Sequence, residues 1–139
     1  MNGDSSGWDQ ALRMAHYNKT SMPAVSLLQA KHMLQWLNTG RFSMFDYGSR
    51  DLNVAAYGQP HPVDIAAEYW RINVPVDFAA GKHDGIITPA CVKKHWRQMI
   101  ASSVPRVTYR EFDFGHLDFT FSAKQDLRHH VISCIDQGA

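Results

Sequence analysis

Two stretches decide the fold: VPVDFAAGKHD at residues 74–84 and VTYREFDFGHLD at residues 107–118. The first begins with a short apolar run, Val74 to Ala80, which a glycine closes and which is typical of a strand buried on both faces. The second alternates from Val107 to Phe114 and is rich in β-branched and aromatic residues, which predicts another strand. Each predicted strand leads directly into a polar loop.

A helix is expected after each strand. Pro89 suits a first helical turn, and this helix should run to about Ala101 with one apolar side, formed by Val92, Trp96 and Met99. Ser122 is expected to cap a last helix that runs to about Ile135, with inward-facing residues Leu127, Val131, Ile132 and Ile135. The βαβα order predicts an α/β fold in which a right-handed crossover joins two parallel strands.

The first half of the chain has a different pattern. Residues 1–22 are polar and have no sustained period, so we expect a loop there. Residues 23–38 predict a helix with one buried face, formed by Val25, Leu27, Leu28, Met33, Leu34 and Leu37. Residues 41–70 combine many aromatics with repeated glycine and proline turn signals, which predicts an irregular segment.

Composition and charge exclude several classes of protein. Apolar residues make up 45% and charged residues 19% of the chain, the balance of a folded globular protein. The net charge is +1 with no basic cluster, so nucleic acid is not expected as a partner. The sequence shows no run long enough for a membrane span and no secretory signal. Two cysteines do not make a disulfide framework, and a cytoplasmic location is the default expectation.

Two side chains are the strongest candidates for chemistry. Asp84 follows the first predicted strand and His116 follows the second. Functional groups in open α/β sheets collect where strands end at their carboxyl edge, and parallel neighbours are only ~4.8 Å apart. We therefore expect Asp84 to accept a hydrogen bond from His116. A carboxylate in this position orients an imidazole as a general base, and acid before histidine is the chain order of α/β-hydrolase triads.

Other interpretations of these loops remain open. Asp84 before a glycine also suits an ordinary turn, and a lone loop histidine is usually only solvated. A metal site formed by His83, Asp84, His116 and Asp118 matches no metal-binding spacing, so no metal or cofactor is expected. Asp118 is expected to brace its loop, and His129 and His130 to lie on an exposed helix face. The one G-x-S-x-G match, at residues 3–7, lies in the polar segment before any predicted strand, and no serine sits at a strand-to-helix turn, so a triad serine is missing.

Several segments together resemble a known family. AGKHDGII and FGHLDFTF, with TGRFSMFDYGS and HYNKTSMPAVS upstream, are similar to the C-terminal half of the acid lipases of gastric and lysosomal type. They are closer still to plant and algal lipase-like proteins with an AB-hydrolase-associated lipase region. The resemblance implies that Asp84 and His116 are triad members and that the chain is a C-terminal fragment lacking the nucleophile half. Residues 1–70 would form a cap, and residues 71–139 the final βαβα part of the core.

The resemblance also suggests a substrate. The parent would be a serine ester hydrolase acting on a lipid or another hydrophobic ester such as a glycerolipid, with association at a membrane or lipid-droplet surface. Four aromatic residues of the cap, Trp36, Phe42, Phe45 and Tyr47, either line the acyl pocket or form core. The chain alone is expected to be inactive because it has no nucleophile. The alternative is a non-catalytic binding or interaction module derived from a lipase.

Overall fold

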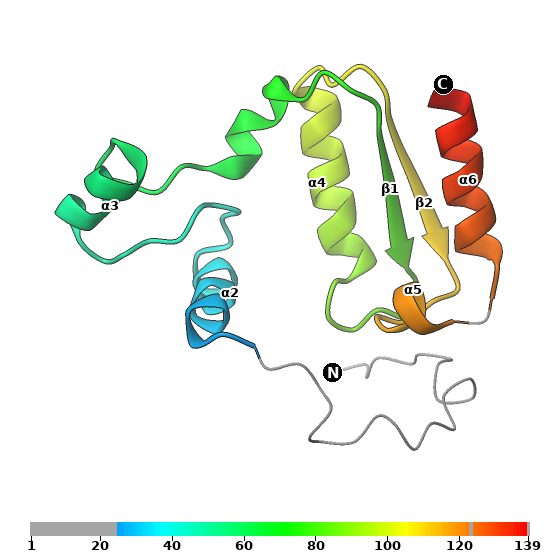
Figure 1. Cartoon of the computed structure of the whole chain (residues 1–139), viewed down its shortest axis with the longest axis horizontal. Helices are drawn as coiled ribbons and strands as arrows, with labels where there is room; N and C mark the ends of the chain where they lie inside the picture. Colours follow the sequence, from blue (N-terminus) through cyan, green and yellow to red (C-terminus); the bar gives the residue numbers. More distant parts are fainter. Residues whose placement is uncertain (1–24, 123, 139) are drawn as a thin grey trace. The chain divides into compact units, whose positions relative to one another are not determined.

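The computed structural model describes residues 25–122 and 124–138, which form two compact units (Figure 1). One unit contains the described residues up to Tyr69, and the other begins at Trp70. The predicted loop at residues 1–22 and Pro23 of the predicted first helix lie outside the described residues.

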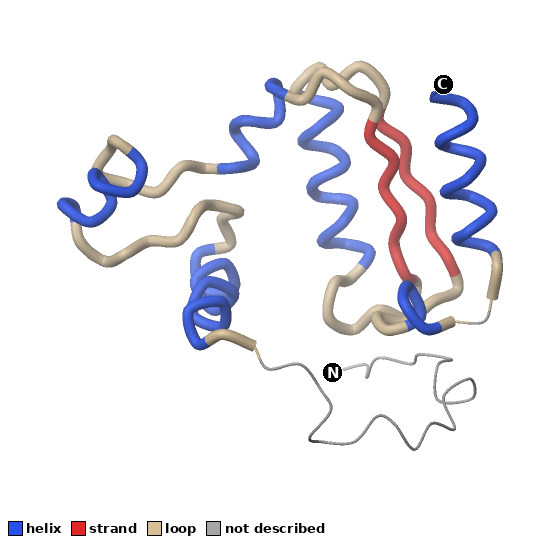
Figure 2. Tube along the Cα trace, viewed as in Figure 1, coloured by secondary structure: helices blue, strands red, loops and turns tan. Residues whose placement is uncertain are grey.

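The unit from Trp70 onward is built on a parallel pair of strands, β1 (Val76–Gly81) and β2 (Val107–Phe112). Val76 pairs with Val107 and Gly81 with Phe112, so the strands end together. Helix α4 (Pro89–Ala101) connects them, and α6 (Asp126–Gly138) follows. Figure 2 shows the two strands between these helices. The predicted βαβα order and parallel pairing are confirmed.

Local chemistry explains where α4 begins. Thr88 is the N-cap, and its hydroxyl accepts a hydrogen bond from the backbone N–H of Cys91 at 3.4 Å. Pro89 occupies the first helical position, where a missing N–H costs nothing. The predicted apolar side of Val92, Trp96 and Met99 is half-buried. The predicted boundaries of this helix are therefore confirmed.

The most deeply buried residues of this unit lie at the carboxyl end of the strands. Ala80, Phe112 and Phe114 are buried, with 1%, 4% and 1% of their surface exposed. Asp77, near the start of β1, is exposed. The expectation that β1 is buried on both faces along its length is therefore wrong, because only its last two residues are fully buried.

The end of the chain also differs from the prediction. A short helix, α5 (Asp118–Phe121), replaces the expected loop, and Ser122 is its C-cap instead of the N-cap of α6. On α6 the expected inward residues Val131, Ile132 and Ile135 are 46%, 45% and 64% exposed. Its inward contact comes from His130, whose ring lies 5.4 Å from that of Phe112. The helix is rotated relative to the expected inward face because the aromatic ring of His130 packs against the sheet.

The unit up to Tyr69 contains α2 (Leu27–Thr39), α3 (Arg50–Tyr57) and most of a 3₁₀ helix, η1 (Ile65–Arg71). The segment expected to be irregular thus contains two helical stretches, α3 and η1, between irregular parts. The predicted buried face of α2 is also wrong: Leu27 and Leu37 are 74% and 79% exposed, and no residue of this helix is fully buried. The packing contacts of α2 are made by polar and aromatic side chains of its other face, including His32 and Gln35.

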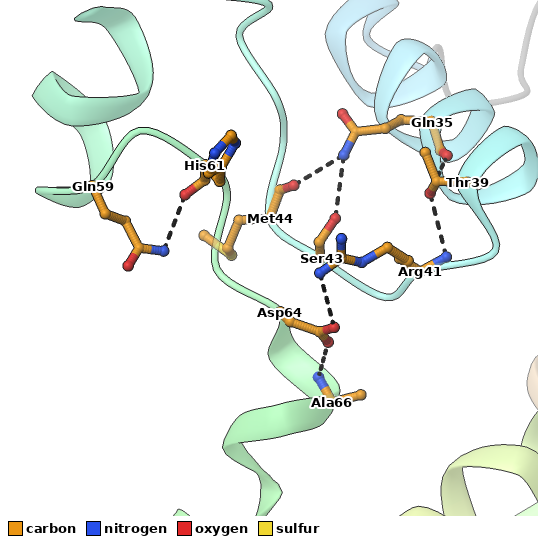
Figure 3. A network of polar contacts seen from close by, with 9 residues as sticks. All are labelled: Gln35, Thr39, Arg41, Ser43, Met44, Gln59, His61, Asp64 and Ala66. Carbon is orange, nitrogen blue, oxygen red and sulfur yellow. Dashed lines mark hydrogen bonds and ion pairs between the residues drawn. The ribbon is translucent and has the colours of Figure 1, made fainter. Parts of the chain in front are cut away.

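Polar side chains hold the segment after α2 in place (Figure 3). The amide of Gln35 donates to Ser43 Oγ at 3.3 Å and to the Met44 carbonyl at 3.1 Å. Asp64 accepts from Arg41 at 3.4 Å and from the Ala66 N–H at 3.1 Å, which stabilises the start of η1. Side chain–backbone bonds thus organise this unit. Its described residues contain a single isolated β-bridge, between Ser43 and Asp64.

Candidate active site

The strand ladder continues past the ends of the strands and holds two loops side by side. Beyond Gly81, the backbone N–H of Lys82 donates to the Phe112 carbonyl at 2.9 Å. The N–H of His83 then donates to the Phe114 carbonyl at 3.0 Å. The loop that contains Asp84 is thereby fixed to the segment that leads to His116.

Gly81 permits this close approach. A Cβ atom at this position would lie 2.6 Å from the Phe114 carbonyl oxygen and 3.0 Å from Cε2 of Phe119. The carbonyl belongs to the backbone and cannot rotate away, so only glycine fits. The sequence pattern indicates only that Gly81 ends a strand, because the closeness of Gly81 to Phe114 has no local sequence signal.

Asp84 and His116 meet as expected. Oδ2 of Asp84 lies 3.0 Å from Nδ1 of His116. Oδ1 of Asp84 accepts from the backbone N–H groups of Ile86 at 2.8 Å and Ile87 at 2.7 Å. The Asp84 side chain is 4% exposed and that of His116 is 35% exposed. The carboxylate is therefore desolvated but fully engaged, and the imidazole reaches the surface.

The contact determines how His116 is oriented. A carboxylate can only accept hydrogen bonds, so the proton of this contact is placed on Nδ1 of His116. Proton exchange with another molecule would then use Nε2. A backbone turn closed by the Asp84 N–H and the Gly81 carbonyl, at 3.1 Å, keeps the carboxylate at the end of β1.

Asp118 braces the histidine loop. Its Oδ2 accepts from the Gly115 N–H at 2.7 Å, and its own N–H donates to the Gly115 carbonyl at 3.2 Å. Asp118 is 5% exposed. Phe114, almost fully buried, packs against the rings of Phe112 and Phe119. His116 is thus held between a buried aromatic residue and a buried carboxylate.

His83 points to a different partner. Its Nε2 lies 2.7 Å from Oδ1 of Asp113, whose other oxygen accepts from Lys124 at 3.2 Å. These hydrogen bonds from His83 and Lys124 lower the pKa of the Asp113 carboxyl. Among the described residues, no group of three or more histidine, cysteine or acidic side chains is arranged to hold a metal ion. The contact between His83 and Asp113 was not anticipated from the sequence, because the two residues are far apart in the chain.

The four aromatic residues considered for substrate binding lie together in the other unit. Trp36 and Phe42 have ring centroids 5.2 Å apart, and Phe45 and Tyr47 have centroids 5.1 Å apart. His32 joins the pairs, at 4.3 Å from Trp36 and 5.6 Å from Phe45. The indole N–H of Trp36 is satisfied by the Ser43 carbonyl at 2.7 Å. The structure therefore shows one aromatic cluster, whose residues all belong to the unit up to Tyr69.

None of the helices in the described part of the chain has the length and apolar character needed to cross a bilayer.

Comparison with known proteins gives a consistent set of relatives. Triacylglycerol lipase 1 of Arabidopsis thaliana is 29% identical over 77% of the chain, which corresponds to 27% of that lipase. Lipase member N of mouse is 29% identical over 81% of the chain, and human lipase member M is 28% identical over 77%. No model of a known protein family matches the chain. The sequence resemblance to lipases is confirmed, and the chain spans about a quarter of the length of these relatives.

These lipases also bear on the fold. The mixed arrangement of helices with a parallel pair of strands fits part of an α/β fold, and the likeness to lipases implies the α/β-hydrolase type.

Proposed function

We propose that the chain supplies the acid and the base of a serine ester hydrolase, with Asp84 as the triad carboxylate and His116 as the general base. The observation that supports this most strongly is the 3.0 Å contact between Asp84 Oδ2 and His116 Nδ1, at the carboxyl end of two parallel strands. The order of acid before histidine agrees with α/β-hydrolases. A chance ion pair on the surface would not require a carboxylate that is 4% exposed and held by two backbone N–H groups.

The chemistry assigns one role to each side chain. As a serine oxygen attacks the ester carbonyl, Nε2 of His116 takes the hydroxyl proton, and Asp84 stabilises the imidazolium that forms. His116 then gives this proton to the departing alcohol oxygen. A water molecule repeats the sequence on the acyl-enzyme and releases the acid. Because neither of the described loops that lead from a strand into a helix contains a serine, the nucleophile and the oxyanion hole would come from outside this sequence.

We propose hydrophobic acyl esters, such as glycerolipids, as the substrate class. The relative named triacylglycerol lipase supports this choice. The unit up to Tyr69 would then act as a cap, with Trp36, Phe42, Phe45 and Tyr47 as acyl-chain contacts. Tyr47 is 44% exposed, and the exposed leucines of α2 suit association of the complete protein with a lipid surface. A cytoplasmic location is compatible with the free thiols of Cys91 and Cys134.

A chimera tests the proposed roles. Residues 70–139 would replace the matching segment of Arabidopsis triacylglycerol lipase 1, and hydrolysis of a long-chain p-nitrophenyl ester would be measured. We expect activity that falls by about 10³-fold or more in His116→Ala, because loss of a triad member removes most of the rate enhancement. Asp84→Asn should also fall strongly. His129→Ala, on the exposed side of α6, is the matched histidine control and should remain active.

The result that would contradict the proposal is equally concrete. If the folded chimera hydrolyses the ester equally well with and without the His116 imidazole, then His116 is not the base. The 139-residue chain alone should show no turnover, and turnover that depended on His116 would show that the nucleophile lies within this sequence.

A second candidate is a non-catalytic interaction module derived from a lipase. The observation that favours it is that, among the described residues, no serine lies at a turn from a strand into a helix. An inactive chimera that folds and retains the Asp84–His116 contact would support this candidate.

A further inference from the structure

A second cluster of charged groups lies beside the candidate dyad. Asp113 directly follows β2, and its carboxylate accepts from His83 Nε2 at 2.7 Å and from Lys124 Nζ at 3.2 Å. Lys124 also donates to the Asp113 backbone carbonyl at 3.1 Å. His83 precedes Asp84 in the chain, and Asp113 precedes His116 by three residues. The cluster therefore joins the acid loop, the histidine loop and the segment that leads into α6.

The dyad itself does not use these side chains. The side chains of His83, Asp113 and Lys124 are 47%, 64% and 51% exposed, whereas Asp84 is 4% exposed. The pKa of Asp113 is lowered, first by the hydrogen bond from His83 and then by Lys124, so this carboxylate is ionised at neutral pH. Exposed ion pairs contribute little to global stability. This cluster is therefore expected to contribute little to the stability of the unit.

We infer that Asp113 is a positioning residue: its hydrogen bonds to His83 and Lys124 set the distance between Asp84 and His116. The inference rests on the proposed function, since it assigns a purpose to the Asp84–His116 contact. His83 is tied to the other loop twice: its backbone N–H donates to the Phe114 carbonyl at 3.0 Å, and its ring bonds to Asp113. The backbone hydrogen bond to Phe114 fixes the position of His83. The hydrogen bond from its ring to Asp113 then restrains rotation of the loop about that backbone bond. Asp84 is the next residue, so it shares this restraint.

The same strand pair offers a matched control at its opposite end. Asp77 accepts from Arg106 at 3.3 Å and from the Thr108 hydroxyl, so it too is a carboxylate that links β1 to β2. Asp77 lies near the amino end of β1, far along the strands from Asp84. Removing either carboxylate breaks a cross-strand link, but only Asp113 adjoins the candidate dyad.

The test measures the ring tautomer of His116 in the full 139-residue chain by ¹⁵N NMR at a pH where the ring is neutral. The His116 signals are identified by their loss in His116→Gln. In the unsubstituted chain the proton should reside on Nδ1, because Asp84 accepts there. Asp113→Ala should shift part of the population to the Nε2–H tautomer that an unrestrained histidine favours. Asp77→Ala should leave the tautomer unchanged.

A conservative variant separates positioning from general loss of structure. In His83→Gln the amide can still donate to Asp113, so the Nδ1–H tautomer should be largely retained. In His83→Ala it should be lost to the same extent as in Asp113→Ala. Equal tautomer shifts in Asp113→Ala and Asp77→Ala, or an unchanged tautomer in Asp113→Ala, would overturn the inference.

The two possible failures are distinguishable. If Asp84→Asn changes the tautomer of His116 but Asp113→Ala does not, the proposed dyad stands and the positioning role is wrong. If the unsubstituted chain lacks the Nδ1–H tautomer, the dyad fails, and the role of Asp113 fails with it.

Discussion

The two units of the chain fix their loops by different means. After β1 and β2, backbone-to-backbone bonds from Lys82 and His83 carry the strand ladder into the candidate active site. In the unit up to Tyr69, side chains make the corresponding bonds to the backbone, such as those of Gln35 and Asn53. Backbone pairing tolerates many side chains but demands close approach, whereas side chain–backbone bonds demand one residue type at each position. Substitutions should therefore act differently in the two units.

The largest effect is expected at Gly81. In Gly81→Ala the new Cβ would be 2.6 Å from the Phe114 carbonyl oxygen, so the ladder must separate and the free energy of unfolding should fall by about 2–3 kcal/mol. Urea denaturation followed by circular dichroism measures this change.

A matched glycine lies in the other unit. Gly58 caps α3 at φ 71°, and a Cβ there would meet no atom within 4 Å. Gly58→Ala should cost about 1 kcal/mol from backbone strain alone. If the two alanine variants were equally stable, close approach at Gly81 would not be what distinguishes the units.

The next effect concerns the side-chain bonds of the first unit. Asn53 is 3% exposed; its amide donates to Asp46 at 3.0 Å and to the Pro60 carbonyl at 3.2 Å, and its oxygen accepts from the Tyr47 N–H at 3.1 Å. Asn53→Ala removes these bonds and should lower the free energy of unfolding by about 2 kcal/mol.

The control for this substitution is Asn38→Ala. Asn38 is exposed on α2, and its replacement should change stability by less than about 0.5 kcal/mol. A loss of the same size at both asparagines would show that burial and hydrogen bonding at Asn53 do not organise its unit.

The same contrast explains what the sequence could predict. The order of strands, helices and loops after Val74 has a strong local signal in the sequence. Because the carboxyl ends of parallel strands meet at one edge of a sheet, Asp84 and His116 could be placed together in advance. The restraints around them, such as His83 with Asp113 and Gly81 against Phe114, join residues about 30 positions apart and have no local signal.

The structure of the unit up to Tyr69 is predicted less well from the sequence, for a related reason. Gly48 and Gly58 are clear turn signals, but the segment between them is mostly α3, an eight-residue helix that Asn53 anchors by its side chain. The apolar spacing of α2 predicted a buried face, yet these residues are exposed and His32, Gln35 and Trp36 make the contacts. Periodicity describes which residues share a helix face and does not establish which face is covered.

Alkaline pH should change the stability of the two units differently, by less than the substitutions at Gly81 and Asn53 do. Burial, then the hydrogen bond to Glu111, raises the pKa of Tyr109 to about 12. The pKa of the unfolded tyrosine is about 10, so the stability linked to the protonated phenol is complete below pH 10 and is lost as the pH rises toward 12. After a discount for solvent screening, Tyr109→Phe should reduce the loss of stability between pH 9 and 11 by about 1 kcal/mol.

Tyr57 provides the comparison in the first unit. Burial, followed by the neighbouring Tyr47, raises the pKa of Tyr57 as well. Urea midpoints at pH 9 and pH 11 for both phenylalanine variants measure the two contributions. A Tyr109→Phe profile as steep as that of the unsubstituted chain would contradict the role assigned to Tyr109.

The smallest effect is expected at the ion pair between Arg41 and Asp64, shown in Figure 3. The Arg41 side chain is 66% exposed, so its attraction to Asp64 at 3.4 Å is screened by water, and Arg41→Met should change the free energy of unfolding by less than about 0.5 kcal/mol. Asp64→Ala should cost about 1 kcal/mol, because Asp64 also accepts the Ala66 N–H at the start of η1. Urea denaturation of both variants compares the two bonds of one carboxylate. A larger loss from Arg41→Met than from Asp64→Ala would mean that charge, and not the side chain–backbone bond, holds this part of the unit.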